Sequence, residues 1–504
     1  MVEYFIKRPM LLCSIGCIII SVTGFYMPRT LIFILCFLSV IIGILVYKAK
    51  DRKLLFLSSL IFIMTLSTMS TVNNINTLSE YASSSCEAQL TVISTDFKCD
   101  DFYVSQVSVL KSDVLPRGTK LTVFYTPLNL SAGSKINANI NIKEIKDSYS
   151  KRDSFSKNIF LSGNLKNIKQ IDSKPNFILN YAEKIRNYIK TKLFGNLAYK
   201  EASTLSALIY GDKSYFSDEF YSNVKSSGVA HVMVVSGLHL SVMVGITDII
   251  SKKLFYNRFL RAVLIILTTL FISALCGFTM SILRAGLTYF IMSTGLMLDR
   301  KGKSDNSLGF ALTLILIFSP FAIFSLALQL SVLSTYGILA VALPVSGFIR
   351  KRELIPNKRV LNIFDCVLMT LSASLFTLPV TIYVFGYTST VSVFTNLLIS
   401  LAVTADIYLA VFAILLSAIF PFWSEFLFLP CSLVTRYVNF VIDFLGSMPF
   451  SVIRLPEIYA FLAGILIFGV MWLLLACKNR INMLKLEEVK NKIIKEGGKK
   501  VRWR

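Results

Sequence analysis

Long apolar runs dominate this sequence and restrict the folds that it can adopt. About twelve of them approach the roughly 20 residues that an α-helix needs to cross a bilayer. The chain is 54% hydrophobic and 16% charged, with a mean hydropathy of +0.65, a balance that soluble domains do not carry. We therefore predict a polytopic α-helical membrane protein of about 12 spans, at residues 10–27, 30–47, 53–71, 228–250, 260–277, 279–298, 308–326, 328–348, 361–385, 394–419, 425–446 and 457–476.

The positive charge of the chain predicts its topology. The net charge is +23, and Lys and Arg gather in the loops at 47–53, 251–261, 299–304 and 350–359. Because basic loops are retained in the cytoplasm, both termini are predicted to be cytoplasmic and the polar region after the third span to lie outside. The same charge would also attract an anionic partner such as nucleic acid or lipid headgroups. The basic tail from 478 onward fits either a lipid-contacting end or a nucleic-acid arm.

A polar region at 72–175 interrupts the apolar runs and is rich in β-strand patterns. The segment "KINANINIK" at 135–143 places Ile136, Ala138, Ile140 and Ile142 on one face and three Asn residues on the other. This strict period of two is the mark of a half-buried strand. Four or five such strands within about ninety residues predict a small β-barrel, for which an OB-like fold and a sandwich are both open.

The next segment predicts a helix on the membrane surface. In "FILNYAEKIRNYIKTKLFG" apolar residues recur every three or four positions and basic residues fill the other face, which is typical of an interfacial amphipathic helix. The resulting domain plan has five parts: three N-terminal spans at 1–71, the extracytoplasmic β domain at 72–175, the amphipathic helix at 176–200, a channel-type helical domain at 201–477 and a basic tail at 478–504.

The two histidines of the chain lie in one glycine-broken apolar stretch, "SSGVAHVMVVSGLHLSV" at 226–242. "ALIYGDK" at 207–213 precedes it and "GFTMSILRAGL" at 277–287 follows it. Together these segments resemble the competence domain of the ComEC family. The family pattern G-x-A-H-x-x-x-x-S-G-L-H is supplied here by Gly228, Ala230, His231, Ser236, Gly237, Leu238 and His239.

The resemblance covers nearly all of the chain and carries functional expectations. Further elements that match are Pro320, Gln329, Ser331, Pro379, Phe385 and Asn396, although "ISLAV" stands where many members have a proline after Asn-Leu-Leu. The family implies a channel in the bacterial cell membrane that passes single-stranded DNA into the cytoplasm during natural transformation. It also implies a surface DNA receptor, a cytoplasmic DNA-translocating ATPase and a homo-oligomer as partners. A transporter or sensor for another anionic substrate is the alternative.

We expect no enzymatic activity from this chain. Many ComEC-family members carry a C-terminal metallo-β-lactamase-like domain, whose metal site is rich in histidine, whereas this sequence has two histidines in all. The expectation is therefore a short form without nuclease function. There is also no Walker A lysine motif, so energy would come from a partner ATPase or an ion gradient. No cofactor is expected.

Polar groups inside several apolar runs predict a path through the bilayer. Such groups cost free energy in lipid and normally face the interior of a helical bundle or water. For the histidines four interpretations stay open: a metal site, a catalytic pair with Ser236, hydrogen bonds that join helices, and the lining of a channel. For Arg284 and Asp406, a single helix-joining ion pair is the alternative to a lining. The predicted path consists of His231, Ser236, Gly237, His239, Arg284, Gln329, Asn396 and Asp406.

The β domain offers groups that suit single-stranded DNA. Aromatic rings stack on bases and cations neutralise phosphates, whereas the alternative is that the rings fill the barrel core. The candidates are Phe97, Lys98, Phe102, Tyr103, Tyr125, Arg117 and Lys120. Cys86 and Cys99, the two cysteines of this polar region, are predicted to form a disulfide because the outside of the cell is oxidising.

Overall fold

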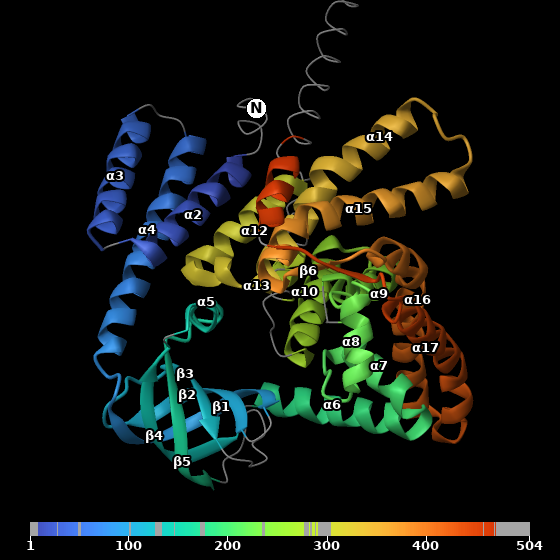
Figure 1. Cartoon of the computed structure of the whole chain (residues 1–504), viewed down its shortest axis with the longest axis horizontal. Helices are drawn as coiled ribbons and strands as arrows, with labels where there is room; N and C mark the ends of the chain where they lie inside the picture. The colour runs from blue at the N-terminus through green and yellow to red at the C-terminus, as the bar shows by residue number, and fades with distance from the viewer. Residues whose placement is uncertain are drawn as a thin grey trace, which may run out of the picture.

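The computed structural model describes most of the chain. It covers residues 9–27, 29–48, 52–99, 102–125, 134–145, 147–171, 177–233, 237–276, 304–456 and 458–467, together with 282, 285–287, 289–290 and 469. Figure 1 shows two groups of helices and a β-barrel that lies beside the second group and below the first.

The first group of helices contains the N-terminal segment of the chain. Its members are α2 (Pro9–Tyr26), α3 (Arg29–Lys48), α4 (Arg52–Ser79) and α12 (Ser304–Phe318), with α12 packed against α2. Cys17, Met64 and Leu316 are fully buried between them. The side-chain oxygen of Asn306 accepts a hydrogen bond of 3.0 Å from the backbone N–H of Met10, so α12 also caps the start of α2.

The predicted strands form a closed five-stranded barrel. They are β1 (Ser85–Cys99), β2 (Phe102–Ser112), β3 (Lys120–Tyr125), β4 (Lys135–Glu144) and β5 (Leu161–Ile171). The order around the barrel is β1-β2-β3-β5-β4, with β3 and β5 parallel and the other described pairs antiparallel. The alternation in β4 is confirmed, because its four predicted apolar side chains are at most 2% exposed and point into the barrel.

The barrel is held against the first helical group by α4 and α5. Helix α4 continues past the predicted boundary at residue 71 to Ser79, and Leu78 packs into the barrel core. Helix α5 (Ser148–Ser156) connects β4 to β5 and contacts the short 3₁₀ helix η1 (Pro320–Phe324) that follows α12. The Ser319 hydroxyl lies 3.1 Å from Asn158 Oδ1 at this junction.

The second helical group contains the segments on both sides of the histidines. It consists of α6 (Phe177–Asn196), α7 (Tyr199–Tyr210), α8 (Asp218–Ser226), α9 (Gly237–Leu254), α10 (Arg258–Leu275), α16 (Ser392–Ile419) and α17 (Ser424–Gly446). The longest interface is between α16 and α17, and α7 and α8 also contact α17. Side chains buried in this core include Leu205, Val229, Ile407 and Phe428.

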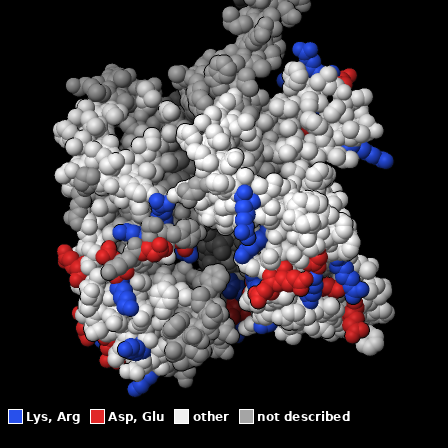
Figure 2. Space-filling view, viewed as in Figure 1, with Lys and Arg blue, Asp and Glu red and all other residues white. Residues whose placement is uncertain are grey.

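Three further helices and a two-stranded sheet link the two groups. Helix α13 (Leu326–Gly337) continues through a π-helical turn at Ile338–Ala342 into α14 (Leu343–Lys351), and α15 (Lys358–Phe385) packs on α13. Strand β6 (Tyr387–Ser389), just before α16, pairs with β7 (Val452–Arg454), which follows α17. In Figure 2 the upper helices present a mostly uncharged surface, while charges gather lower on this face and at the turn between α14 and α15.

The helices confirm a membrane protein, although not the predicted number of spans. Within the described residues, seven helices are long and apolar enough to cross a bilayer: Pro9–Tyr26, Leu54–Ser79, Arg258–Leu275, Leu326–Lys351, Lys358–Phe385, Ser392–Ile419 and Pro421–Gly446. The run predicted at 308–326 ends at Phe318, because Pro320 begins a separate 3₁₀ turn. The run predicted at 228–250 begins as a helix at Gly237 instead.

Candidate channel site in the helical bundle

One side of α17 carries polar side chains through the core of the second helical group. They recur at steps of three or four residues and so line one face of the helix, over roughly 18 Å. We call them the α17 seam: Cys431, Ser432, Thr435, Arg436, Asn439 and Asp443. This face of α17 meets α7, α8 and α16.

Asp406 of α16 contacts the first turn of the α17 seam and is fully buried. Its Oδ2 accepts a hydrogen bond of 2.8 Å from the Thr435 hydroxyl, and its Oδ1 lies 3.2 Å from the Cys431 thiol. Within the described residues no Lys or Arg forms an ion pair with it. Asp406 therefore joins α16 to α17 through neutral donors.

Glu201 of α7 holds the next part of the α17 seam. Its carboxylate is 4% exposed and accepts hydrogen bonds from Arg436 Nε at 2.6 Å and from the Ser432 hydroxyl at 2.8 Å. Burying a carboxylate is costly unless a cation and further donors satisfy it, and here both are present. Removing Arg436 would leave Glu201 buried without its charge partner.

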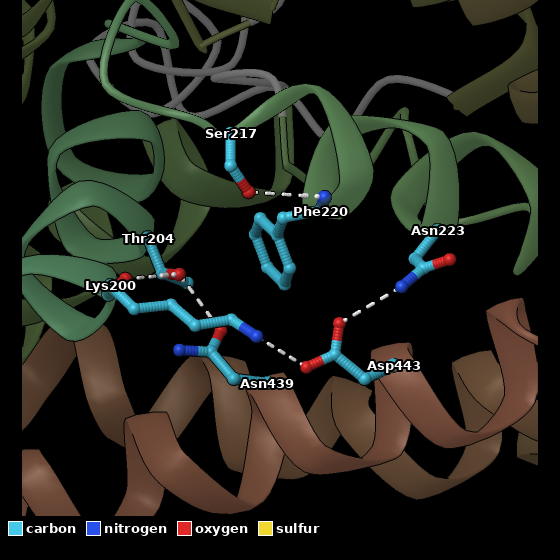
Figure 3. A network of polar contacts seen from close by, with 7 residues as sticks. All are labelled: Lys200, Thr204, Ser217, Phe220, Asn223, Asn439 and Asp443. Atoms are coloured by element: carbon cyan, nitrogen blue, oxygen red, sulfur yellow. Dashed lines mark hydrogen bonds and ion pairs between the residues drawn. The ribbon is translucent and has the colours of Figure 1, made fainter.

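The outer end of the α17 seam joins three helices (Figure 3). Thr204 of α7 donates a hydrogen bond of 2.8 Å to Asn439. Asp443 forms an ion pair with Lys200 of α7 and accepts a bond of 3.1 Å from the Asn223 amide of α8. Lys200 also lies over the ring of Phe220, 4.9 Å from its centroid, so the ion pair and the aromatic contact fix its position.

The charge balance of the α17 seam identifies it as a brace between helices. The seam and its bonded partners on α7 and α16 contain three carboxylates and two cations, so their net charge is 2 − 3 = −1 when all are ionised. The carboxylates are those of Glu201, Asp406 and Asp443, and the cations are Lys200 and Arg436. A path for a polyanion needs a neutral or positive lining. The groups of the seam are also bonded to one another, so it fixes the helices rather than offering free donors.

The segment "ALIYGDK", which precedes the histidine stretch, forms the end of α7 and the turn after it. Helix α7 ends at Tyr210, and Gly211 closes it with a left-handed φ of 85°. Burial raises the pKa of Tyr210 to about 12. Burial, and then repulsion from Lys225 of α8, lower the pKa of Lys213. These two lysines lie on segments that also carry three carboxylates, so this region has no excess of positive charge.

The histidine stretch itself begins with a turn. Helix α8 ends at Ser226, and Gly228 follows with φ +75°, a backbone conformation that residues other than glycine rarely adopt. A Cβ at this position would lie 2.5 Å from the Cβ of Ser392 and 2.8 Å from that of Ser389. Gly228 thus seats the turn against the start of α16, and the interruption predicted from the glycines is observed.

The two histidines occupy different environments around this break. His231 lies in the turn and is exposed, whereas His239 lies in the first turns of α9 and is 1% exposed. Gly237 is the first residue of α9. Ser236 and Arg284, which the sequence also placed on the path, lie outside the described residues. Among the described residues, no three His, Cys, Asp or Glu side chains are grouped as a metal site requires.

The comparisons with known proteins address this same region. A family model described as "Competence protein" matches residues 208–480, which is just over half of the chain and includes the histidine stretch, Asp406 and the α17 seam. The chain belongs to the competence protein family. The ComEC resemblance seen in the sequence is therefore confirmed.

A curated relative supports the same assignment. ComE operon protein 3 of Bacillus subtilis (strain 168) is 26% identical to this chain over 194 residues. The alignment spans 38% of this chain and 24% of the relative, so it covers about a quarter of the relative's length. No solved structure matches the chain.

Two other predicted path residues of this ComEC-family protein make local contacts. The Gln329 amide donates a hydrogen bond of 2.8 Å to the carbonyl of Ile323 and so supports the first turn of α13. Asn396 is half-buried in α16, and its backbone carbonyl accepts the hydroxyl of Ser400. Asn396 precedes Asp406 by ten residues, or about 15 Å along the helix. The structure thus distributes these residues over different elements.

In the barrel, one predicted DNA-stacking residue is wrong. Tyr125 is 2% exposed, and its hydroxyl lies 2.8 Å from that of Ser105 inside the barrel. Its neighbour Phe124 points outward and is 39% exposed. Arg117 and Lys120 are exposed as predicted. The side chains of Phe97, Lys98, Phe102 and Tyr103 lie outside the described residues.

The predicted disulfide is also wrong. Cys86 and Cys99 lie at opposite ends of the single strand β1, and Cys86 is a free thiol that accepts a weak hydrogen bond from Ser112. Twelve extended residues lie between the two and separate them by roughly 40 Å along the strand, whereas a disulfide needs Cα atoms within about 7 Å. The bulges of β1 shorten this path without folding the strand back on itself.

Several residues of the α17 seam and their partners on α7 were not predicted from the sequence. Glu201, Thr204, Arg436, Asn439 and Asp443 were not singled out, although Arg436 and Asp443 interrupt an apolar run as plainly as Asp406 does. The step of three to four residues from Cys431 to Asp443 was the available signal for a polar face.

Proposed function

We propose that this protein is the membrane channel that passes single-stranded DNA into the cytoplasm during natural transformation. The observation that carries the proposal is the family match over residues 208–480, the part of the chain with the broken helix and the buried polar groups. Seven apolar helices supply the membrane domain that such a channel requires.

The proposed DNA path passes the turn at residues 227–233 rather than the α17 seam. Backbone outside a regular helix is tolerated at membrane depth only where protein buries it or water reaches it. His231 is exposed at this turn, and exposed Lys225 lies shortly before it at the end of α8. In this proposal the histidines are uncharged polar groups of the lining, and Arg284 contributes a fork that grips phosphate.

The barrel is proposed to be OB-like and to receive the strand. Its order β1-β2-β3-β5-β4 describes a small closed barrel, a shape that recurs in domains that bind single-stranded nucleic acid. Exposed Phe124 stands on β3 together with exposed Lys120, and Arg117 precedes the strand. Stacking on the ring and neutralisation by the cations would bind DNA with little sequence preference.

The proposed setting is the bacterial cell membrane, with both termini in the cytoplasm and the barrel outside. A surface receptor would deliver DNA and a cytoplasmic ATPase would draw it inward. We propose no nuclease activity for this chain and a homo-oligomer as its working form. The basic end of α14, with Arg350, Lys351 and Arg352, supports this orientation.

Uptake of labelled DNA by a deletion strain tests the proposal. Loss of internalised label, with normal binding of DNA at the cell surface and recovery on complementation, is the expected result. Normal uptake in the deletion strain would refute the channel. Normal DNA uptake combined with a defect in another anionic solute would support the alternative transporter.

A further inference from the structure

A pocket with two cations lies where the barrel meets the first helical group. It is formed by the end of α2, the polar end of α4, helix α5 and η1. We call it the α2–α5 pocket. Its lining consists of Gly24, Phe25, Tyr26, Met27, Val72, Ile75, Asn76, Lys151, Arg152, Phe155 and Phe321.

The cations of the α2–α5 pocket lack an acidic partner. Lys151 Nζ lies 5.5 Å from the ring centroid of Phe155, and Arg152 Cζ lies 5.8 Å from that of Tyr26. Neither forms an ion pair with a described residue, whereas Lys157 at the end of α5 pairs with Asp153 at 3.0 Å. Two uncompensated positive charges at one pocket favour an anion, and the ring contacts hold both side chains in place.

An apolar face leads directly to the α2–α5 pocket. The exposed side chains of α2 recur on one side of the helix and end at Tyr26: Leu12, Ile15, Ile19, Val22 and Tyr26. This face is roughly 20 Å long, which is enough to cross the roughly 15 Å of hydrocarbon in one leaflet of a bilayer. Beside the pocket, α4 changes from apolar residues to "TVNNINTLS". The pocket thus lies where both helices leave the hydrocarbon region.

We propose that the α2–α5 pocket binds the headgroup of an anionic phospholipid, with its acyl chains along the exposed face of α2. The phosphodiester would lie between Lys151 and Arg152. DNA shares this phosphodiester, but the pocket suits bases poorly, because Phe155 and Phe321 are 5% and 1% exposed and Arg152 lies over the ring of the exposed Tyr26. The lipid would brace the barrel against the membrane helices, and the proposal does not depend on DNA transport.

Titration of the purified full chain with dioleoyl phosphatidylglycerol, read by native mass spectrometry from a zwitterionic detergent, tests this site. The double variant Lys151→Gln/Arg152→Gln should bind the lipid roughly thirtyfold more weakly, since each cation near an anionic surface contributes about a factor of five. The charge-conserving variant Lys151→Arg/Arg152→Lys should retain binding. Lys157→Gln is the matched control, because it removes one cation of α5 that is already paired.

Three further probes identify the source of the phosphate. Dioleoyl phosphatidylcholine and glycerophosphoglycerol, which lacks acyl chains, should both bind much more weakly than the anionic lipid. A single-stranded oligonucleotide should not displace the lipid. The proposal would be overturned if the double variant bound the anionic lipid as tightly as the unaltered protein, or if phosphatidylcholine or glycerophosphoglycerol bound as tightly as the anionic lipid. Displacement of the lipid by the oligonucleotide would also overturn it and would assign the pocket to DNA.

Discussion

Replacing Gly228 by alanine tests whether the histidine stretch is seated as the structure describes. The change acts twice. A non-glycine residue in the left-handed region at φ +75° costs about 1–2 kcal/mol. The new Cβ would also lie 2.5 Å from Ser392 and 2.8 Å from Ser389, and such overpacking costs about 1–3 kcal/mol. The sum, about 2–5 kcal/mol, is a large part of the 5–15 kcal/mol that typically stabilises a fold.

A second glycine in the same protein separates the two contributions. Gly386 has φ +70° and no atom within 4 Å of a Cβ built on it, so Gly386→Ala carries the conformational cost alone. Thermal unfolding of both purified variants in one detergent should show a clearly larger loss for Gly228→Ala. Adding Ser392→Gly to Gly228→Ala removes the closer of the two contacts and should restore part of the loss, as a double-mutant cycle measures.

The same variants connect this local geometry to transport. At matched protein levels, uptake of labelled DNA should fall further with Gly228→Ala than with Gly386→Ala, because only the former displaces the turn that carries His231. Equal shifts of the unfolding midpoint for the two glycine variants would contradict the close contact with α16. A large loss of stability with no recovery from Ser392→Gly would contradict the assigned cause.

Three further predictions concern side chains of the helices and the barrel. Asp406→Asn keeps the size of the side chain and can still accept a hydrogen bond from Thr435, so its free energy of unfolding should lie within about 1–2 kcal/mol of that of the unaltered protein. Asp406→Leu should lower the free energy of unfolding by about 3 kcal/mol or more. Thermal unfolding measures both variants, and equal effects would refute the hydrogen-bonded brace. His→Gln at His231 and at His239 should preserve much of the DNA uptake while His→Leu abolishes it, because the amide remains polar; full activity of both Leu variants would show that the histidines are incidental. In the barrel, Phe124→Ala should weaken binding of a single-stranded oligonucleotide about fivefold or more at low salt through the loss of one stacked base, measured by fluorescence anisotropy on the full chain, and an unchanged affinity would remove Phe124 from the DNA surface.

The barrel shows what strand periodicity can and cannot predict. The alternation of Ile and Asn in β4 predicted both the strand and its buried face, and the structure confirms them. The same rule applied to "KLTVFY" in β3 places Leu121, Val123 and Tyr125 on one face and Phe124 on the other. The prediction of Tyr125 as a stacking residue did not apply this alternation, which assigns its ring to the buried face of the strand.

In the helical bundle, the sequence revealed which residues are polar but not which of them meet. Asp406 was predicted to be buried, with Arg284 as an alternative partner, yet its two oxygens contact Thr435 and Cys431. The pairing depends on how α16 and α17 rotate about their axes, and apolar composition does not fix that rotation. Glu201 was missed because it lies in a mixed segment outside the predicted spans, and only the fold brings it to Arg436.

Helix α4 sets the rotational phase of the barrel relative to the membrane helices. It runs from Arg52 to Ser79 without glycine or proline, the usual causes of a kink, and its last turns place Leu78 in the barrel core. Insertion of one residue into its middle would turn everything beyond by about 100° and advance it by only 1.5 Å. Leu78 would turn together with the barrel, whereas Asn158 would face away from Ser319 and the barrel core away from Phe321. Four inserted residues restore the phase almost completely, so the barrel should tolerate changes in this helix by whole turns far better than by single residues.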